Sequence, residues 1–339
     1  MAKPQFRIAT FNLLNLNRPG LPIYGDAAGL TQAAYDRKIA FTARMLQGLH
    51  SDVWGFQELW HAGALNDALA AAGLATHVPL VPPGHAGQGI VCAAAVHQEI
   101  LAGDPEWIET FPEDLHLSSG GDDAQTEGIS VSLKSFSRPV LHFQIKPVAG
   151  APALHVYVCH LKSKSPTKVW REPWYDPDTH SKHSEAIGSA VSTIRRTAEA
   201  AALRYILTER MKNTDEPVIV LGDVNDGVLS NTMNVLTGQP NFLVGFSLGG
   251  GDTDLYTAQT LQEYRSTRDV YYTHIFQNNF ESLDQILVSQ ELYDNSRRRI
   301  WKFVDLSIAN DHLHFDPDHS DGSNDHGVVR VTFEHDPAH

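Results

Sequence analysis

The sequence predicts an α/β fold in which two mainly antiparallel sheets pack together and helices cover their outer faces. Short apolar runs of strand length recur from residue 7 to residue 333, and many follow one another without a helix between them, which is typical of antiparallel pairing. Helical patterns occur among the first strands and before the last group. No linker, repeat or charge block divides the chain, so we expect one domain over residues 1–339 with its core at 6–333.

The first half alternates short strands with helices or polar loops. Residues 7–11 form an apolar run of strand length, and residues 35–49 place Ile39 and Leu46 among apolar residues at helical spacing. The apolar runs that follow predict strands at 53–56, 76–78, 89–96, 129–133, 140–145 and 154–159, with one further helix at 64–72.

The second half contains the clearest helical pattern, at 185–211. Its apolar residues step by three or four positions and predict one buried stripe, made of Ile187, Val191, Ile194, Ala198, Ala201 and Tyr205. The apolar run 218–221, entered through Pro217 and stopped by Gly222, predicts a buried strand. A glycine-rich loop at 249–251 and strands at 270–275, 283–288 and 328–333 complete the order.

Composition restricts the function classes. The net charge of −14 argues against a protein that coats nucleic acid nonspecifically, because such proteins neutralise phosphates with an excess of lysine and arginine. Cys92 and Cys159 lie in strand-like runs, which predicts two buried free thiols. No stretch approaches the roughly 20 apolar residues of a membrane helix, and the first residues lack the apolar core of a signal peptide. We therefore expect a cytoplasmic protein without a membrane span.

Polar side chains recur at the ends of the predicted strands. The pair Asp223 and Asn225 lies on one face of its strand end, because side chains alternate along a strand. Sheet enzymes commonly keep their chemistry at such an edge, although single Asp and Asn residues are also typical of ordinary turns. The other members of the series are Asn12, Glu58, His160, Asp284, and Asp325 with His326. Six such signals in order indicate a functional site.

In this order the motifs resemble those of the endonuclease/exonuclease/phosphatase superfamily, which has the deoxyribonuclease I-like fold. The resemblance spans Thr10 to Thr332. It implies a four-layer α/β/β/α sandwich, a divalent metal that is normally Mg²⁺ with Mn²⁺ as a substitute, and hydrolysis of a phosphoester. The run from His160 to Lys164 resembles that of bacterial nucleases in this superfamily, and its histidine separates the chain from exonuclease III-like repair enzymes.

The resemblance implies a metal site and a water-handling site. Glu58 and Asp325 would be metal ligands with Asn12 beside them, in keeping with the preference of Mg²⁺ for hard oxygen atoms. Asp223 would orient or deprotonate the attacking water, and Asn225 would fix the geometry by hydrogen bonds.

Two histidines complete the implied site. His160 and His326 would flank the phosphate, one or both of them cationic, and Asp284 would orient His326. Either Asp223 or His326 can be the general base, and both assignments stand. The acidic partner that the resemblance implies for His160 would fall near residues 88–95, where the sequence offers no carboxylate. A second Asn-Asp-His run at 310–312 does not lead directly into a strand, so the site is assigned to Asp325 and His326.

Further residues are candidates for contact with substrate. They are Lys162, Lys164, Arg138 and Arg196, the last of which could instead support the site. Residues 168–175 place Trp170, Trp174 and Tyr175 beside Lys168 and Arg171; such a set can stack bases and contact phosphates, or the loop can pack its own rings.

These features predict a metal-dependent nuclease that cuts DNA or RNA. The alternative is a phosphatase or phosphodiesterase acting on a phosphorylated small molecule or a lipid, as sphingomyelinases do, which the acidic charge and the same histidine motif favour. A member of the superfamily that only binds its ligand is a third possibility, against which the intact set of polar residues argues.

Overall fold

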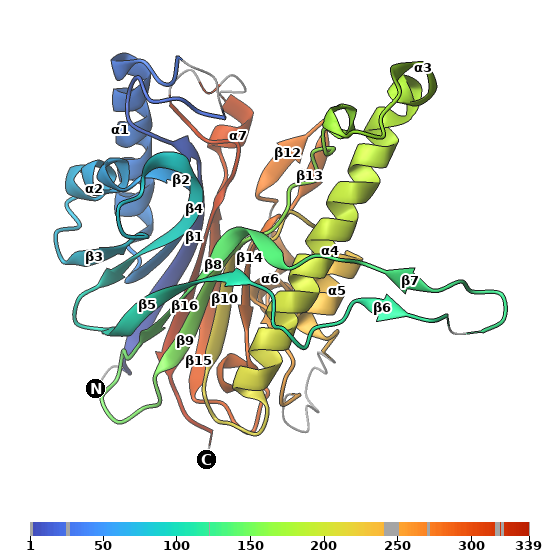
Figure 1. Ribbon diagram of the computed structural model, residues 1–339. Coiled ribbons are helices and arrows are strands. Elements are labelled where there is room, and N and C mark those ends of the chain that lie inside the picture. The colour runs from blue at the N-terminus through green and yellow to red at the C-terminus, as the bar shows by residue number, and fades with distance from the viewer. Residues whose placement is uncertain are drawn as a thin grey trace.

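Two six-stranded sheets form the centre of the protein (Figure 1). The computed structural model describes residues 3–24, 28–121, 123–240, 251–269, 272–315, 319 and 322–338. The first sheet has the order β15 (Trp301–Ala309), β16 (Val328–His335), β1 (Gln5–Leu16), β2 (Val53–His61), β4 (Ala86–His97) and β3 (His77–Leu80). The second has the order β11 (Tyr256–Thr257), β14 (Asp284–Val288), β10 (Val218–Asp223), β9 (Leu154–His160), β8 (Ser135–Ile145) and β5 (Leu101–Thr110).

Each sheet contains one parallel pair of strands within an otherwise antiparallel order. In the first sheet β1 runs parallel to β2, and in the second β9 runs parallel to β10. All other pairs in the two sheets are antiparallel. The carboxyl ends of a parallel pair meet at the same edge, so each sheet presents two strand ends side by side.

Four layers follow from three separate hydrophobic cores. One core lies between the sheets and contains Ile8 and Ile219; a second lies between the first sheet and α1 (Gln32–Leu49) with α2 (Ala62–Ala71). The third lies between the second sheet and α4 (Ser184–Met211) with α5 (Asn231–Thr237). Neighbours along a strand, such as Val220 beside Ile219, belong to different cores because side chains alternate. The predicted α/β/β/α sandwich is confirmed.

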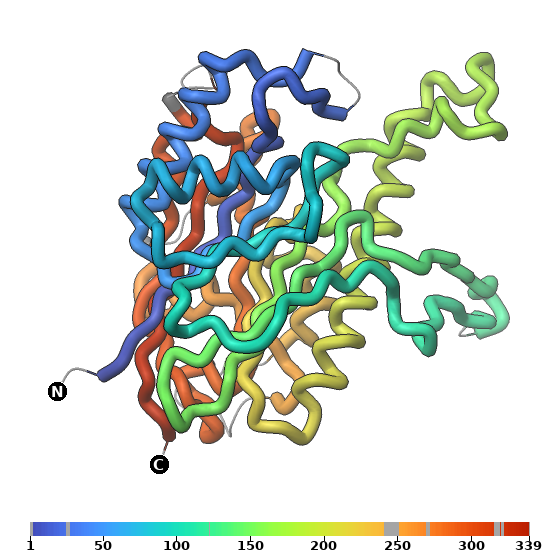
Figure 2. The backbone as a smooth tube through the Cα atoms, turned by 60° about the vertical axis from the view of Figure 1, so that its left-hand side comes forward, coloured from blue at the N-terminus to red at the C-terminus, as the bar shows by residue number. Residues whose placement is uncertain are grey.

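Several short elements lie outside the four layers. Figure 2 shows that the hairpin β6 (Ser118–Ser119) and β7 (Ile129–Ser130) stands clear of the body, as does the segment that carries α3 (Pro177–His180). The remaining elements are η1 (Val169–Arg171), η2 (Ser181–His183), α6 (Ala258–Glu263), η3 (Thr267–Asp269), β12 (His274–Phe276), β13 (Asn279–Glu281), η4 (Gln290–Leu292) and α7 (His312–Phe315). Within the described part of the chain, no helix is both long and apolar enough to cross a membrane.

The structure corrects the predicted strands in two ways. The strand expected at 129–133 ends at Ser130 and pairs only within its hairpin. The sequence pattern missed β5 and β15, which are edge strands whose polar residues face solvent and interrupt the apolar run. Parts of two predicted elements lie outside the described residues. These are residues 270–271 of the predicted strand 270–275 and residues 249–250 of the predicted loop 249–251.

The buried stripe predicted along α4 is mostly wrong, because Ala198 is the one buried residue among the six that were predicted. Val191 and Ile194 are 40% and 50% exposed, while Arg196 and Glu199 are buried. The start of the helix extends beyond the sheet, so no apolar layer lies beneath it. Its buried face instead packs against the polar loop that follows β9 and makes hydrogen bonds to it, as described below.

Two histidines on β8 and β9 form a buried chain of polar contacts. His142 Nδ1 lies 2.6 Å from a carboxylate oxygen of Glu106, and His142 Nε2 lies 2.9 Å from His155 Nδ1. His155 Nε2 lies 3.3 Å from a carboxylate oxygen of Glu216. Burial, reinforced by the charge of Arg210, lowers the pKa of His155 to about 4. His155 is therefore neutral in the folded protein at pH 7.

This shift predicts how stability depends on pH. As the pH falls from about 6.5 to about 4, the unfolded chain binds a proton at His155 that the folded chain excludes, so the free energy of unfolding falls. Between pH 7 and pH 4, we expect the free energy of unfolding to fall by about 3 kcal/mol less in the His155→Gln variant than in the wild type. Urea unfolding at both pH values measures the difference. His116→Gln, at an exposed histidine, is the control, and equal losses in all three proteins would contradict the prediction.

Candidate active site

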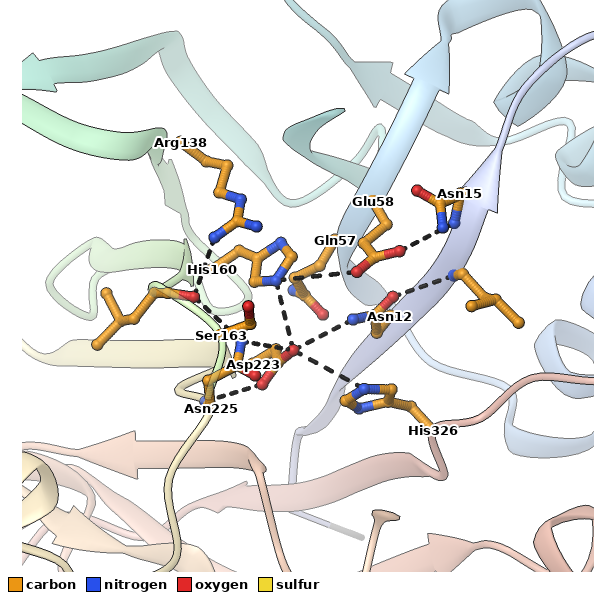
Figure 3. A network of polar contacts seen from close by, with 12 residues as sticks. Asn12, Asn15, Gln57, Glu58, Arg138, His160, Ser163, Asp223, Asn225 and His326 are labelled. Atoms are coloured by element: carbon orange, nitrogen blue, oxygen red, sulfur yellow. Dashed lines mark hydrogen bonds and ion pairs between the residues drawn. The ribbon is translucent and has the colours of Figure 1, made fainter. Parts of the chain in front are cut away.

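Polar side chains from both sheets meet in one network (Figure 3). The strand β1, which carries Asn12, runs away from the end of the sandwich where the two termini lie (Figure 1). Asn12 lies opposite Gln57 in the register of β1 and β2, which places Glu58 next to it. In the second sheet, Asp223 lies opposite both His160 and Asp284. Asp325 and His326 precede β16 and complete the group. The predicted polar residues therefore converge because the strand ends that carry them are neighbours.

The end of β10 has a backbone that only glycine fits. Gly222 has φ +143°, and a Cβ atom there would lie 1.9 Å from the backbone oxygen of Cys159. Asn225 follows in the left-handed region with φ 57°, which Asn adopts more readily than most residues. Its backbone N donates to Asp223 Oδ1 at 2.8 Å, and its Nδ2 donates to Asp223 Oδ2 and to the backbone oxygen of Leu161, each at 3.0 Å.

Glu58 is also held in the left-handed region, with φ 59°. This conformation is uncommon for a long side chain and costs about 1 kcal/mol or more, so the surroundings must maintain it. The pairing of β2 with β4 shifts register across this position, and a similar shift follows Asn12 in β1. The shifted β1 backbone presents the N–H of Asn15, which donates to Glu58 Oε2 at 3.0 Å.

Asp223 lies at the centre of the polar network in Figure 3. Besides Asn225, Asn12 Nδ2 donates to its Oδ2 at 3.2 Å. Nε2 of His160 lies 3.4 Å from Oδ2 of Asp223, and Nε2 of His326 lies 3.9 Å from it. Burial raises the pKa of Asp223 to about 7, against the opposing charge of His326. A carboxyl group with this pKa can take up and release a proton near neutral pH.

His326 is held as a cation. Its Nδ1 donates to Asp284 Oδ2 at 2.8 Å. Burial alone would lower the pKa of His326, but the charges of Asp284 and Asp223 outweigh it and raise that pKa well above its ordinary value. The imidazolium therefore directs its Nε2 toward Asp223 and the space between the sheets.

His160 is held neutral, in contrast to His326. Burial lowers the pKa of His160 well below its ordinary value, and the charges of Arg138 and His326 lower it further. Nε2 of His160 lies 4.0 Å from Glu58 Oε1, but its buried Nδ1 has no hydrogen-bond partner among the described residues. The lack of a carboxylate at residues 88–95 is consistent with this unpaired nitrogen.

The carboxylates beside Asn12 suit a divalent cation. Burial raises the pKa of Glu58, and the charge of Asp325 raises it further. Oδ1 of Asp325 is buried without a hydrogen-bond partner among the described residues. Asp325 and His326 also lie with His274 in a group whose potential ligand atoms are all within 4.8 Å of one another. Two repelling carboxylates, one with an unpaired buried oxygen, form a donor set that fits a hard cation such as Mg²⁺.

Two buried residues that sequence reasoning missed support the site. Lys38 on α1 donates to Asn324 Oδ1 at 3.4 Å; burial lowers the pKa of Lys38 to about 8, against the charges of Asp325 and Glu58. Glu199 on α4 accepts from the backbone N–H of Lys162 at 2.7 Å and from that of Ser137 at 2.8 Å. Each could have been found in the sequence as a charged residue on the helix face that otherwise packs against the rest of the protein.

The four predicted substrate contacts have different surroundings. Arg138 Nη1 donates to the backbone oxygen of Leu161 at 3.2 Å, beside His160. Arg196 is buried and donates to Asp226 Oδ2 and to the backbone oxygen of Lys162, each at 3.3 Å. The remaining two residues are Lys162, whose Nζ donates to the backbone oxygen of Ser165 at 3.3 Å, and Lys164, whose Nζ donates to Glu281 Oε1 at 2.6 Å. Arg196 thus holds the loop after β9 in place.

Comparisons with known proteins identify the family of this chain. A family model described as the endonuclease/exonuclease/phosphatase family matches residues 9–308. No curated protein matches the sequence.

Solved structures share the fold at low sequence identity. The human Nocturnin catalytic domain with bound sulfate has a TM-score of 0.57 and 14% identity, covering 98% of this chain and 96% of that chain. ANGEL2, a 2′,3′-cyclic phosphatase in complex with adenosine-2′,3′-vanadate, has a TM-score of 0.55 and 13% identity over 98% and 96%. A mannosyl-6-phosphatase of Bacteroides thetaiotaomicron has a TM-score of 0.53 and 13% identity over 97% and 99%.

Proposed function

Because this chain belongs to the endonuclease/exonuclease/phosphatase family, we propose that it is a divalent-metal-dependent phosphoesterase that hydrolyses phosphodiester bonds in DNA or RNA. The observation that carries the proposal is the network around Asp223. One buried carboxyl group with a pKa near 7 lies between a cationic and a neutral histidine, next to two carboxylates that suit a metal. This arrangement provides both a proton acceptor and positive charge for a phosphate.

The residues divide the chemistry between them. Glu58 and Asp325, with Asn12 beside them, would hold Mg²⁺ or Mn²⁺, which supplies charge neutralisation at the phosphate. Asp223 accepts the proton of the attacking water, while Asn225 and Asn12 fix the direction of its carboxylate oxygens.

The two histidines act on the phosphate in different ways. His326, charged through Asp284, donates a hydrogen bond to a phosphate oxygen. Neutral His160 flanks the opposite side. Because His326 is already protonated, it cannot accept the proton of water, and this favours Asp223 as the general base.

A small phosphoester is the second candidate substrate. The fold is shared with proteins named as a mannosyl-6-phosphatase and a 2′,3′-cyclic phosphatase, and the net charge of −14 is unusual for a protein that binds a polyanion. The nuclease proposal has its own support in the run from His160 to Lys164, which resembles that of bacterial nucleases.

Substrate assays separate the two candidates. We expect the purified protein to cleave single- or double-stranded DNA or RNA with Mg²⁺ or Mn²⁺, and EDTA to abolish cleavage because the site depends on a divalent cation. The same samples are tested on phosphorylated sugars, nucleoside phosphates and sphingomyelin, with phosphate release as the measurement. Turnover confined to this second panel would replace the nuclease proposal with the small-phosphoester one.

A further inference from the structure

The segment between β9 and α4 leaves the body of the protein directly after His160. Its outer part, residues 168–183, contains η1, α3 and η2 and is called the aromatic arm here. It lies at the same end of the sandwich as the polar network (Figure 1), and Figure 2 shows it standing clear of the body. Its position in the chain therefore ties it to the site on one side and to α4 on the other.

The base of the aromatic arm is fixed on α4. Val169 is buried, and the backbone N–H of Thr167 donates to the backbone oxygen of Gly188 at 3.0 Å. This approach needs glycine, because a Cβ at position 188 would lie 2.4 Å from the backbone oxygen of Thr167. Ser192 Oγ also donates to the backbone oxygen of Ser165 at 2.8 Å. The aromatic arm thus projects from a rigid support.

The tip of the aromatic arm is closed by its own hydrogen bonds. Asp176 caps α3, accepting from the backbone N–H of Asp178 at 3.1 Å and from Thr179 Oγ1 at 2.8 Å. The ring of His180 lies 5.3 Å from that of Trp174 and 5.6 Å from that of Tyr175, measured between centroids. These contacts order the loop without covering its outer surface.

Two large rings remain on the outside of this ordered loop. Trp170 is 54% exposed and Trp174 is 51% exposed. Tryptophan is rarely left open to solvent, and a pair on one projecting element is typical of a binding surface. Preordered rings lose little conformational entropy when a partner binds, so they can contribute most of their buried area to affinity.

The charge of the segment differs from that of the whole chain. The aromatic arm contains three lysines and arginines and three acidic residues, so it is balanced in charge, whereas the chain has 26 against 40. Lys162 and Lys164 are engaged within the protein. Lys168, Arg171 and Lys182 are exposed and form no ion pair with any residue that the structure describes. Three cations that form no ion pair with the described residues thus lie on the aromatic arm, close in the chain to its exposed rings.

We propose that the aromatic arm binds single-stranded nucleic acid, with bases stacked on Trp170 and Trp174 and phosphates next to Lys168, Arg171 and Lys182. The proposal rests on the nuclease function proposed above and names the substrate as an unpaired polynucleotide, because bases offer their faces for stacking only when they are not enclosed in a duplex. A lipid surface fits less well, since Glu172 lies between the two tryptophans in the chain and would be carried with them toward the headgroups.

Chain length limits where on the substrate the aromatic arm acts. Trp170 is ten residues from His160, so the two positions are at most about 36 Å apart. Within this reach the aromatic arm stands clear of the body (Figure 2), so it would bind nucleotides that flank the bond that is cut. Loss of its rings should weaken the binding of long strands and leave the hydrolysis of a small diester unchanged.

The test measures binding and turnover separately. Binding of fluorescently labelled single-stranded oligonucleotides of 20 and 4 nucleotides is followed by anisotropy in EDTA, and turnover is measured with Mg²⁺ on the 20-mer and on bis(p-nitrophenyl) phosphate. For the double variant W170A/W174A we expect at least tenfold weaker binding of the 20-mer, on the scale of base stacking, with diester turnover within twofold of the wild type. Tyr264→Ala, at an exposed ring directly after α6, is the matched control.

Each outcome bears on one of the two proposals. Three results would overturn the role of the aromatic arm. The first is unchanged 20-mer binding in W170A/W174A, and the second is an equal loss of 20-mer binding and of diester turnover in that variant. The third is a wild type that binds anionic vesicles in preference to the 20-mer. A wild type that binds the 20-mer through these rings in EDTA but cuts no nucleic acid would support the aromatic arm and overturn the nuclease function. In the variant K168Q/R171Q, we expect 20-mer affinity to depend less steeply on salt, and an unchanged slope would contradict the phosphate contacts.

Discussion

Replacing His326 with glutamine is expected to lower kcat by about 10³-fold, which is the scale of losing a charged donor to the phosphate. The imidazolium is buried, held by Asp284, and lies within 4 Å of Asp223. Glutamine keeps a polar side chain of similar length but carries no charge. Steady-state kinetics on a phosphodiester substrate gives kcat, and circular dichroism with the melting temperature shows whether the fold is intact.

Two further variants determine what the charge of His326 contributes. In Asp284→Asn the pKa of His326 should fall, because the carboxylate that raises it is gone. The pH above which the rate declines should then be lower in this variant than in the wild type. At acid pH, the variant should lose less of its activity relative to the wild type than at higher pH. Asp311→Asn, at an exposed residue of the second Asn-Asp-His run, should change the rate less than tenfold. A loss as large as that of His326→Gln would show that the assignment to residues 324–326 is wrong.

Replacing Glu58 with glutamine is expected to weaken Mn²⁺ binding by at least about tenfold and to reduce kcat/KM by about 10²-fold or more. Its carboxylate is buried next to Asp325, so much of the negative charge that attracts a cation depends on it. Isothermal titration of the metal-free protein measures binding without any turnover. Glu281→Gln, which removes a partly exposed carboxylate paired with Lys164, is the control and should bind Mn²⁺ as the wild type does.

The same variant should change stability in the opposite direction. Folding places Glu58 where its charged form is disfavoured, since burial and the charge of Asp325 raise its pKa. We therefore expect metal-free Glu58→Gln to melt at a higher temperature than the metal-free wild type, and added Mn²⁺ to raise its melting temperature less. If Mn²⁺ raises the melting temperature of both proteins equally, Glu58 is not a ligand.

Much of the fold could be predicted because burial imposes local patterns. A strand between two hydrophobic layers needs apolar side chains on both faces, because its side chains alternate between the layers. The strand β10 has this position, and the run 218–221 is therefore apolar throughout. The pattern failed where the surroundings, not the chain itself, decide burial. Val191 and Ile194 have helical spacing but project past the sheet, and the edge strands β5 and β15 face solvent on one side.

The sequence by itself determined the types and the order of the polar residues at the strand ends. It could not determine their charges or neighbours, because these depend on which strands pair and on how deeply each group is buried. Only the tertiary structure placed Asp284 opposite Asp223, made His326 a cation and His160 neutral, and brought Lys38 and Glu199 under the site. The physical reason is that pKa values follow desolvation and nearby charge, and both arise when segments far apart in the chain are packed together.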